Sequence, residues 1–188
     1  MKIGVLALQG AIREHTQHIE ALGATGVAVK WPRDLSEVAG LIIPGGESTT
    51  IGKLMVEYGF TEAIRDFNAA GKPIYGTCAG MILLAKKITE GNQPLLSLMN
   101  IEARRNAFGR QRESFEADLD IKDIGLFKAI FIRAPWIETV GESVETMAEF
   151  GNIKVMARQG SLLASAFHPE LTGDLRVHKY FLDMIKEA

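Results

Sequence analysis

The sequence predicts an α/β protein, with helices on both faces of a mixed, mostly parallel sheet. Short aliphatic runs alternate with polar stretches of helical periodicity through the first half of the chain. The first run, residues 2–8, is continuous, as in strands that are buried on both faces. Hydrophobic residues make up 47% of the 188 residues, which is enough for one sizeable core. We therefore expect residues 1–188 to form a single domain.

Strands and helices alternate in order through the first half of the chain. The expected strands are residues 2–8, 26–31, 40–43 and 72–75, and the expected helices are residues 12–22, 49–70 and 81–87. Gly59 is expected to interrupt the second of these helices. Strands that are joined by helices pair in parallel, so the helices cover the two faces of the sheet.

From Gln93 onward the pattern changes to strands with few helices between them. The expected strands are residues 101–104, 115–121, 129–133, 153–158 and 162–166. Gln159-Gly160 marks a hairpin turn between the last two. The final stretch, residues 174–188, is an amphipathic helix whose apolar side consists of Val177, Tyr180, Phe181 and Ile185.

Charge and apolar run length exclude several functions. The 21 Lys and Arg nearly balance the 23 Asp and Glu, and a net charge of −2 does not favour binding to nucleic acid or to an anionic membrane. No 18 apolar residues run together, and residues 3–8 are too few for the core of a signal peptide. The one cysteine cannot form an internal disulfide. We expect a cytoplasmic protein whose partners are small solutes and other proteins.

The segment Gly76-Thr77-Cys78-Ala79-Gly80 stands between an expected strand and an expected helix. Glycines two residues before and two after a nucleophile are typical of a nucleophile elbow, a turn too sharp for side chains at its flanks. The thiol would lie at the helix amino terminus, where backbone N–H groups favour the thiolate. A lone cysteine is otherwise most often a small buried hydrophobe. The two glycines favour a catalytic Cys78.

The segment Phe167-His168-Pro169-Glu170 supplies a base for this thiolate. Residues two apart in an extended chain face the same side, so we expect the Glu170 carboxylate to orient the His168 ring and fix its tautomer. Pro169 would end sheet pairing at this point. A histidine at a strand end is, by itself, more often a surface or core residue. Together with the elbow, Cys78, His168 and Glu170 form a predicted catalytic triad.

The segment PGGESTT follows the third expected strand. Its glycines let the backbone approach a ligand closely, and the N–H groups of Gly46 and Ala79 could bind the oxyanion of an acyl-transfer intermediate. A phosphate-binding P-loop does not fit, because Glu47 occupies the position of that motif's first glycine. Capping of the next helix by Ser48 or Thr49 remains possible beside this function.

His15 and His18 lie one helical turn apart, a spacing that could suit a metal ion. No third ligand or cysteine pair is suggested nearby, so a solvated helix face is the better interpretation. We expect no metal and no cofactor in this chain.

Six segments carry a family resemblance: LQGA at 8–11, GGESTT at 45–50, GTCAG at 76–80, RNAFGRQ at 105–111, FIRAP at 131–135 and FHPEL at 167–171. Together they resemble the glutaminase subunit of pyridoxal phosphate synthase, a class I, triad-type glutamine amidotransferase. The cysteine and His-Pro-Glu segments are shared across that class, whereas the fourth and fifth segments are characteristic of this family. The resemblance runs nearly end to end and departs at no motif position.

The resemblance implies a flavodoxin-like, three-layer α/β/α fold and the hydrolysis of L-glutamine to L-glutamate and ammonia through a thioester. It maps the contacts of glutamine onto Gly46, Glu47, Ser48, Arg105, Ile132 and Arg133. A buried arginine suits the α-carboxylate of glutamine, because a guanidinium binds a carboxylate through two parallel hydrogen bonds. Each arginine taken alone would more often be a solvated surface charge.

The resemblance also implies a separate synthase subunit, a barrel protein that uses the ammonia to make pyridoxal phosphate. The vitamer is then a product of the complex and no cofactor of this chain. We expect the docking contact near Gln9-Gly10-Ala11, which follows the first strand and so lies at the same sheet edge as Cys78.

Two other functions stay open at this point. One is the glutaminase of another amidotransferase, such as imidazole glycerol phosphate synthase, with the same triad and another partner. The other is a non-catalytic module of the same fold, in which Cys78 senses oxidation and glutamine is not hydrolysed.

Overall fold

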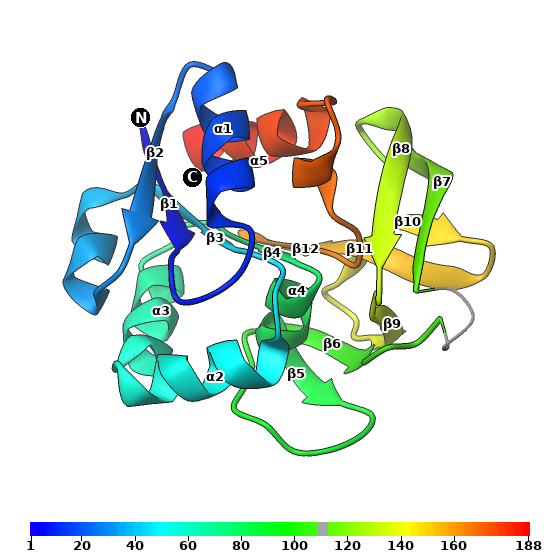
Figure 1. Cartoon of the computed structure of the whole chain (residues 1–188), viewed down its shortest axis with the longest axis horizontal. Coiled ribbons are helices and arrows are strands. Elements are labelled where there is room, and N and C mark those ends of the chain that lie inside the picture. Colours follow the sequence, from blue (N-terminus) through cyan, green and yellow to red (C-terminus); the bar gives the residue numbers. More distant parts are fainter. Residues whose placement is uncertain (109–112) are drawn as a thin grey trace.

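The strands form one long curled sheet and a separate hairpin in the computed structural model, which describes residues 1–108 and 113–188 (Figure 1). The long sheet has the order β2-β1-β3-β4-β12-β11-β9-β6-β5, and β10 pairs with β11. Its strands are β1 (Lys2–Leu6), β2 (Thr25–Val29), β3 (Gly40–Ile43), β4 (Ile74–Thr77), β5 (Ala85–Ile88), β6 (Met99–Arg104), β9 (Trp136–Val140), β10 (Glu145–Phe150), β11 (Ile153–Gln159) and β12 (Leu162–Ser165). The hairpin consists of β7 (Ser114–Ile121) and β8 (Gly125–Ile132).

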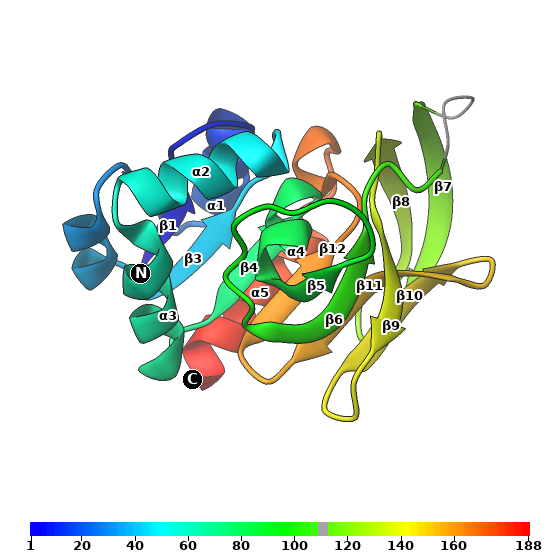
Figure 2. The ribbon, with the colours of Figure 1, turned by 90° about the horizontal axis from the view of Figure 1, so that it is seen from below.

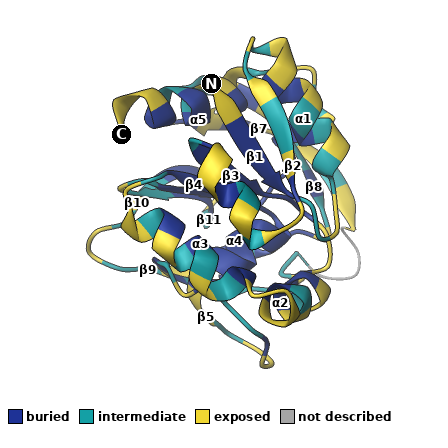
Figure 3. Cartoon of the chain, turned by 90° about the vertical axis from the view of Figure 1, so that its left-hand side faces the viewer, coloured by how far each residue is buried: buried dark blue, intermediate teal, exposed yellow. Residues whose placement is uncertain are grey.

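The first five strands of this order are parallel to one another. Every residue of β3, β4 and β12 is buried, which is why their sequences are apolar without alternation. The predicted parallel sheet is therefore confirmed for this part of the chain. In Figure 3 the central strands of the sheet, such as β1, are dark blue, and the outer surfaces of the helices are largely yellow.

Helices cover both faces of the parallel part (Figures 1 and 2). Helices α1 (Ile12–Ala21) and α5 (Arg176–Glu187) lie on one face, and α2 (Ser48–Glu57), α3 (Phe60–Ala69) and α4 (Ala79–Leu84) lie on the other. Gly59, with φ 73°, separates α2 from α3, as expected from its position. Two short 3₁₀ helices, η1 (Pro32–Glu37) and η2 (Pro169–Leu171), complete the set. In the described part of the chain, no helix has the length and apolar character that crossing a membrane requires.

The second part of the sheet is mostly antiparallel, through β12-β11-β9-β6 and the β10–β11 pair. The predicted turn at Gln159-Gly160 joins β11 to β12. The expected helix over residues 81–87 is wrong at both ends, because α4 spans Ala79–Leu84 and residues 85–88 form β5. β5 pairs in parallel with β6 at the edge of the sheet, where the exposed Lys86 and Lys87 suit a strand that faces solvent.

Aromatic rings join the β7–β8 hairpin to the rest of the molecule. The rings of Phe115 and Phe131 stack with centroids 4.7 Å apart, and Phe108 and Phe150 pack against both. The backbone N–H of His168 also donates to the carbonyl of Ile130 at 2.8 Å. These contacts hold the end of β8 beside the segment that follows β12.

Candidate active site

The elbow segment forms a strained turn between β4 and α4. Cys78 has φ 49° and ψ −100°, a backbone conformation that L-residues rarely adopt. A Cβ atom on Gly80 would lie 2.0 Å from the carbonyl oxygen of Ile43, and one on Gly76 would lie 2.5 Å from the carbonyl group of Gly80. Neither flanking position can hold a side chain, as the sequence pattern predicted.

The thiol of Cys78 lies where β4 and β12 end side by side. The backbone N–H of Cys78 donates to the carbonyl of Ser165, the last residue of β12, at 2.8 Å. Three residues further along the chain is His168. Cys78 and His168 are therefore brought together by two neighbouring parallel strands whose carboxyl ends meet at one edge.

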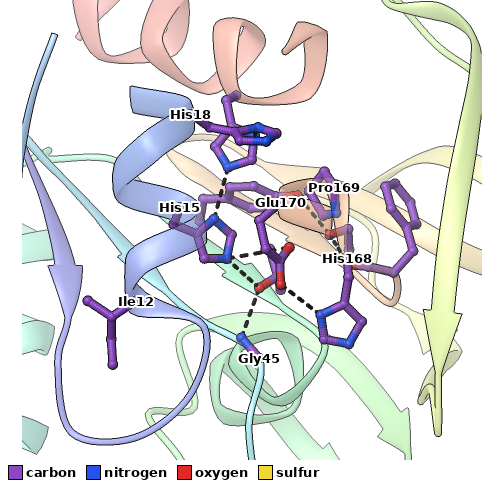
Figure 4. Close-up of polar contacts among 12 residues, drawn as sticks. Ile12, His15, His18, Gly45, His168, Pro169 and Glu170 are labelled. Carbon is purple, nitrogen blue, oxygen red and sulfur yellow. Dashed lines mark hydrogen bonds and ion pairs between the residues drawn. The ribbon is translucent and has the colours of Figure 1, made fainter. Parts of the chain in front are cut away.

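His168 and Glu170 form the predicted pair. The Nδ1 atom of His168 is 2.7 Å from Oε1 of Glu170, which is 4% exposed. The expected extended geometry is wrong, because Pro169 begins the 3₁₀ turn η2 instead. The tight turn nevertheless brings the two side chains together, and Figure 4 shows the Glu170 carboxylate beside the His168 ring.

The environment of His168 favours its charged form. Burial lowers the pKa of this imidazole, but hydrogen bonds to Cys78 and Glu170 outweigh burial and raise the pKa to about 10.

A pocket of about 430 Å³ opens over these groups, a size within the range of small-molecule sites. It is lined by every residue that was predicted to take part in catalysis or binding: Gly46, Glu47, Ser48, Cys78, Ala79, Arg105, Ile132, Arg133, His168 and Glu170. The predicted docking segment, Gln9-Gly10-Ala11, also borders it. Asn106 and Pro135, for which no role was predicted, add to the lining.

The glycine loop lies against the triad and is held by the segment after β1. A Cβ atom on Gly45 would lie 2.5 Å from Cε1 of His168, so this position requires glycine. The carbonyl of Gly45 accepts from the N–H of Ala11 at 3.2 Å. The N–H of Glu47 donates to the Gln9 side chain at 2.8 Å. The loop and the predicted docking segment are thus directly connected.

The cap of α2 differs from the expected one. The Glu47 carboxylate accepts from the backbone N–H groups of Thr49 and Thr50, so Glu47 caps the helix in place of Ser48 or Thr49. A carboxylate reaches two N–H groups at once and suits the positive end of the helix dipole. Burial raises the pKa of Glu47, but the hydrogen bonds from Thr50 and Thr49, with the charge of Arg105, outweigh it and lower the pKa.

The two arginines of the pocket are not buried, contrary to the expectation for a carboxylate-binding arginine. The Arg105 side chain is 32% exposed, and its Nη2 atom lies 3.4 Å from Oε1 of Glu47. Arg133 is exposed and has φ 40°, and its backbone N–H donates to the backbone carbonyl of Glu113. Both lie at the rim because they follow strands that end at the pocket. Gly109, Arg110 and Gln111 of the fourth resemblance segment lie outside the described residues.

His15 and His18 do not form the solvated helix face that was expected. Their side chains point inward from α1, with His15 0% and His18 8% exposed, and both contact His178 of α5. The described residues include no group of His, Cys, Asp or Glu arranged to hold a metal ion. Sequence reasoning could not find this cluster, because His178 is remote in sequence and only the packing of α5 on α1 brings it near.

An elbow cysteine, a histidine paired with a glutamate and a glycine loop line one pocket, which is the arrangement expected of a glutamine amidotransferase. The chain belongs to the SNO glutamine amidotransferase family, whose sequence model matches residues 5–187.

Relatives match along the whole chain. The chain is 59% identical to a protein of Niallia circulans named pyridoxal 5'-phosphate synthase subunit PdxT, over 100% of both chains. It is equally identical to the protein of that name from Moorella thermoacetica, over 98% of this chain and 100% of the other. A solved structure described as a glutamine amidotransferase superposes with a TM-score of 0.95 at 48% identity, over 98% of each chain. The family resemblance and the flavodoxin-like amidotransferase fold predicted from the sequence are confirmed.

Proposed function

We propose that this chain hydrolyses L-glutamine with Cys78 as nucleophile, His168 as proton carrier and Glu170 as the residue that orients His168. The thiol proton passes to His168, and the thiolate attacks the side-chain carboxamide carbon. The imidazolium then protonates the nitrogen, which leaves as ammonia and leaves a thioester on Cys78. His168 next takes a proton from water, whose oxygen attacks the thioester, and glutamate is released. The raised pKa of His168 supports its role as acid, because protonation of the leaving nitrogen needs an imidazolium.

We infer that the N–H groups of Gly46 and Ala79 hold the oxyanion of both tetrahedral intermediates. Ala79 is the first residue of α4, where backbone N–H groups have no partner within the helix. Gly46 lines the same pocket from the opposite loop. Two such donors stabilise the developing charge when both point at the oxyanion.

The remaining pocket residues are assigned to glutamine recognition. We propose that Gly46, Glu47, Ser48 and Ile132 surround the substrate, and that Arg105 and Arg133 hold its α-carboxylate. The lining positions of all six support this assignment. Because both arginines stand at the rim, they would meet the end of glutamine that is remote from Cys78.

The ammonia requires an acceptor on another polypeptide. We propose that residues 1–188 act as one glutaminase domain and that the partner is the synthase subunit of pyridoxal phosphate synthase, a barrel protein. Full-length identity of 52–59% to relatives named as subunits of that synthase supports this partner. The complex would make pyridoxal phosphate and so serve vitamin B6 biosynthesis. We also infer a cytoplasmic location, where Cys78 stays reduced.

The observation that carries the proposal is the His168–Glu170 pair beside the elbow cysteine in one pocket. Its test is the release of glutamate from glutamine by the purified chain, alone and with the synthase subunit. We expect weak release alone and more with the partner. Absence of release under both conditions would favour an oxidation sensor. Release without binding to this synthase in a pull-down would favour the glutaminase of another amidotransferase.

A further inference from the structure

Glu170 lies between two imidazoles, of which the triad uses only one (Figure 4). Oε1 of Glu170 is paired with Nδ1 of His168 at 2.7 Å. Oε2 faces Nε2 of His15 at 3.5 Å, and both of these side chains are 0% exposed. Among the described residues Oε2 has no hydrogen-bond partner, although it is buried. A buried carboxylate oxygen needs a donor, and Nε2 of His15 faces it.

His15 in turn begins a line of three buried histidines. Its Nδ1 atom is 2.9 Å from Nε2 of His178, and Nδ1 of His178 is 3.1 Å from Nδ1 of His18. Its Nε2 atom also lies 3.2 Å from the hydroxyl of Thr77, the residue before Cys78. The line therefore runs from the triad glutamate through α1 and α5 toward the surface.

His15 is neutral in this setting, so it carries one ring proton. Burial, followed by the nearby charges of His178, His168 and His18, lowers the pKa of His15 well below its usual value. A proton on Nδ1 would turn the lone pair of Nε2 toward the Glu170 carboxylate, placing acceptor against acceptor. A proton on Nε2 points at Glu170 instead and leaves Nδ1 free to accept from His178.

The second arrangement gives each contact along the line one donor and one acceptor. His18 donates from Nδ1 to Nδ1 of His178, which donates from Nε2 to Nδ1 of His15, which donates from Nε2 to Glu170. Each ring fixes the tautomer of the next, as the second partners of functional histidines commonly do.

We propose that His15 is a positioning residue of the glutaminase reaction: its Nε2–H holds Oε2 of Glu170, so that Oε1 stays aimed at His168. His178 and His18 keep His15 in the tautomer that makes this contact. The inference rests on the proposed triad, because it assigns a support to one of its members. η2 is a single turn of three residues, so its backbone offers Glu170 little orientation of its own.

His15 does not line the pocket, which sets the kinetic expectation. In the complex with the synthase subunit, His15→Leu should lower kcat about ten- to hundredfold, the range typical of outer partners of functional groups. KM for glutamine should stay within about twofold, since no substrate contact is lost. His15→Gln, whose amide nitrogen replaces Nε2, should restore most of kcat. An unchanged kcat in a folded His15→Leu protein would overturn the proposal.

A double-mutant cycle with Glu170→Ala separates positioning from damage to the fold. If His15 acts through Glu170, His15→Leu should have no further effect on kcat in the Glu170→Ala background. An equal loss in both backgrounds would refute the proposal. Tyr75→Phe is the matched control, because it deletes the buried hydrogen bond to Ser165 in the same core and should lower the melting temperature without lowering kcat.

The tautomer can be measured without any substitution. Nitrogen-15 NMR of the histidine-labelled full chain should place the ring proton of His15 on Nε2, and a proton on Nδ1 would contradict the proposal whether or not the variants fold.

The proposed triad and the proposed role of His15 can be refuted separately. Glutamate release by Cys78→Ala would refute the proposed triad. Loss of activity in Cys78→Ala together with a normal kcat in His15→Leu would refute only the proposed role of His15.

Discussion

Two parts of the molecule meet at one pocket and contribute different kinds of residue to it. One is made of the parallel strands β2-β1-β3-β4-β12, and the other is a mostly antiparallel part that contains β11, β9, β6 and the β7–β8 hairpin. From the parallel part come Cys78, His168 and Glu170, each buried and each on a tight turn after a central strand. From the other part come Arg105, after β6, and Arg133, after β8, both open to solvent. The groups that we propose to react thus follow the central parallel strands, and the groups that we propose to recognise glutamine lie at the margin of the pocket.

This difference follows from the way the two parts are built. Parallel strands bring all their carboxyl ends to one edge, so groups that are distant in sequence meet there without long loops. The antiparallel part reaches the same edge only through the segments that follow β6 and β8. Substitutions should therefore affect kcat in the first part and KM in the second.

The largest effect is expected for Cys78→Ala. Removing the thiol leaves no nucleophile, so glutamate release with the synthase subunit should fall by at least about a thousandfold. The fold should survive, since alanine is small and the strain lies in the backbone. Mass spectrometry after treatment with an electrophilic glutamine analogue should find the label on Cys78 alone. Attachment elsewhere, or substantial remaining activity, would contradict the assignment.

His168→Asn should be nearly as damaging, because base and nucleophile act as a unit. Glu170→Gln should lower kcat less, since the packing of η2 keeps part of the orientation of His168. Circular dichroism of both proteins provides the control for folding. If Glu170→Gln were the more damaging of the two, the assignment of His168 as proton carrier would be wrong.

The two parts also differ in how far their residues could be predicted from the sequence. The elbow and the His-Pro-Glu segment are local patterns, so the sequence alone is enough to name Cys78, His168 and Glu170. The β9 and β10 strands were missed because sequences such as WIETV and ETMAEF mix apolar and charged residues without a clear period. The proposed role of His15 could not be predicted, because its partners come from α5 and η2 and meet it only in the folded chain.

The next largest effect tests the antiparallel part. Arg105→Ala and Arg133→Ala should each raise KM for glutamine by about ten- to hundredfold, the value of a hydrogen bond to a charged group. The kcat value should change much less, because neither side chain reaches the triad. Arg104→Ala is a suitable control, since Arg104 pairs with Glu138 and does not line the pocket. A fall in kcat at unchanged KM would place the arginines in the reaction instead.

A smaller effect is expected for Gly46→Val, in the glycine loop that follows β3. We propose that partner docking turns the Gly45–Gly46 peptide and completes the oxyanion hole, raising glutamate release at least about tenfold. A Cβ atom on Gly46 would lie 2.5 Å from Oε1 of Gln9 and 3.1 Å from Ile51, so valine should block this movement. Stimulation should disappear while binding to the synthase, measured by calorimetry, persists. Equal activity of the isolated chain and the complex would exclude this gating.

The smallest effect concerns folding stability, and it again separates the two parts, because all four histidines belong to the parallel one. Burial, with the charge of His18, lowers the pKa of His178 from 6.5 to about 3, and burial lowers those of His15 and His18 as well. At a pH between 6.5 and the lowered pKa of a folded-state histidine, the unfolded chain binds more protons than the folded chain. The free energy of unfolding therefore falls as the pH drops below about 6.5. The pKa of His168 is raised to about 10, so its stabilising contribution to the free energy of unfolding is fully present below pH 6.5 and does not change with pH in that range.

Urea unfolding from pH 7 to pH 5 should therefore show a loss in the free energy of unfolding of up to about 1.4 kcal/mol per pH unit for each neutral histidine. His178→Gln should flatten this dependence, and an unchanged slope would show that its ring takes up a proton in the folded state.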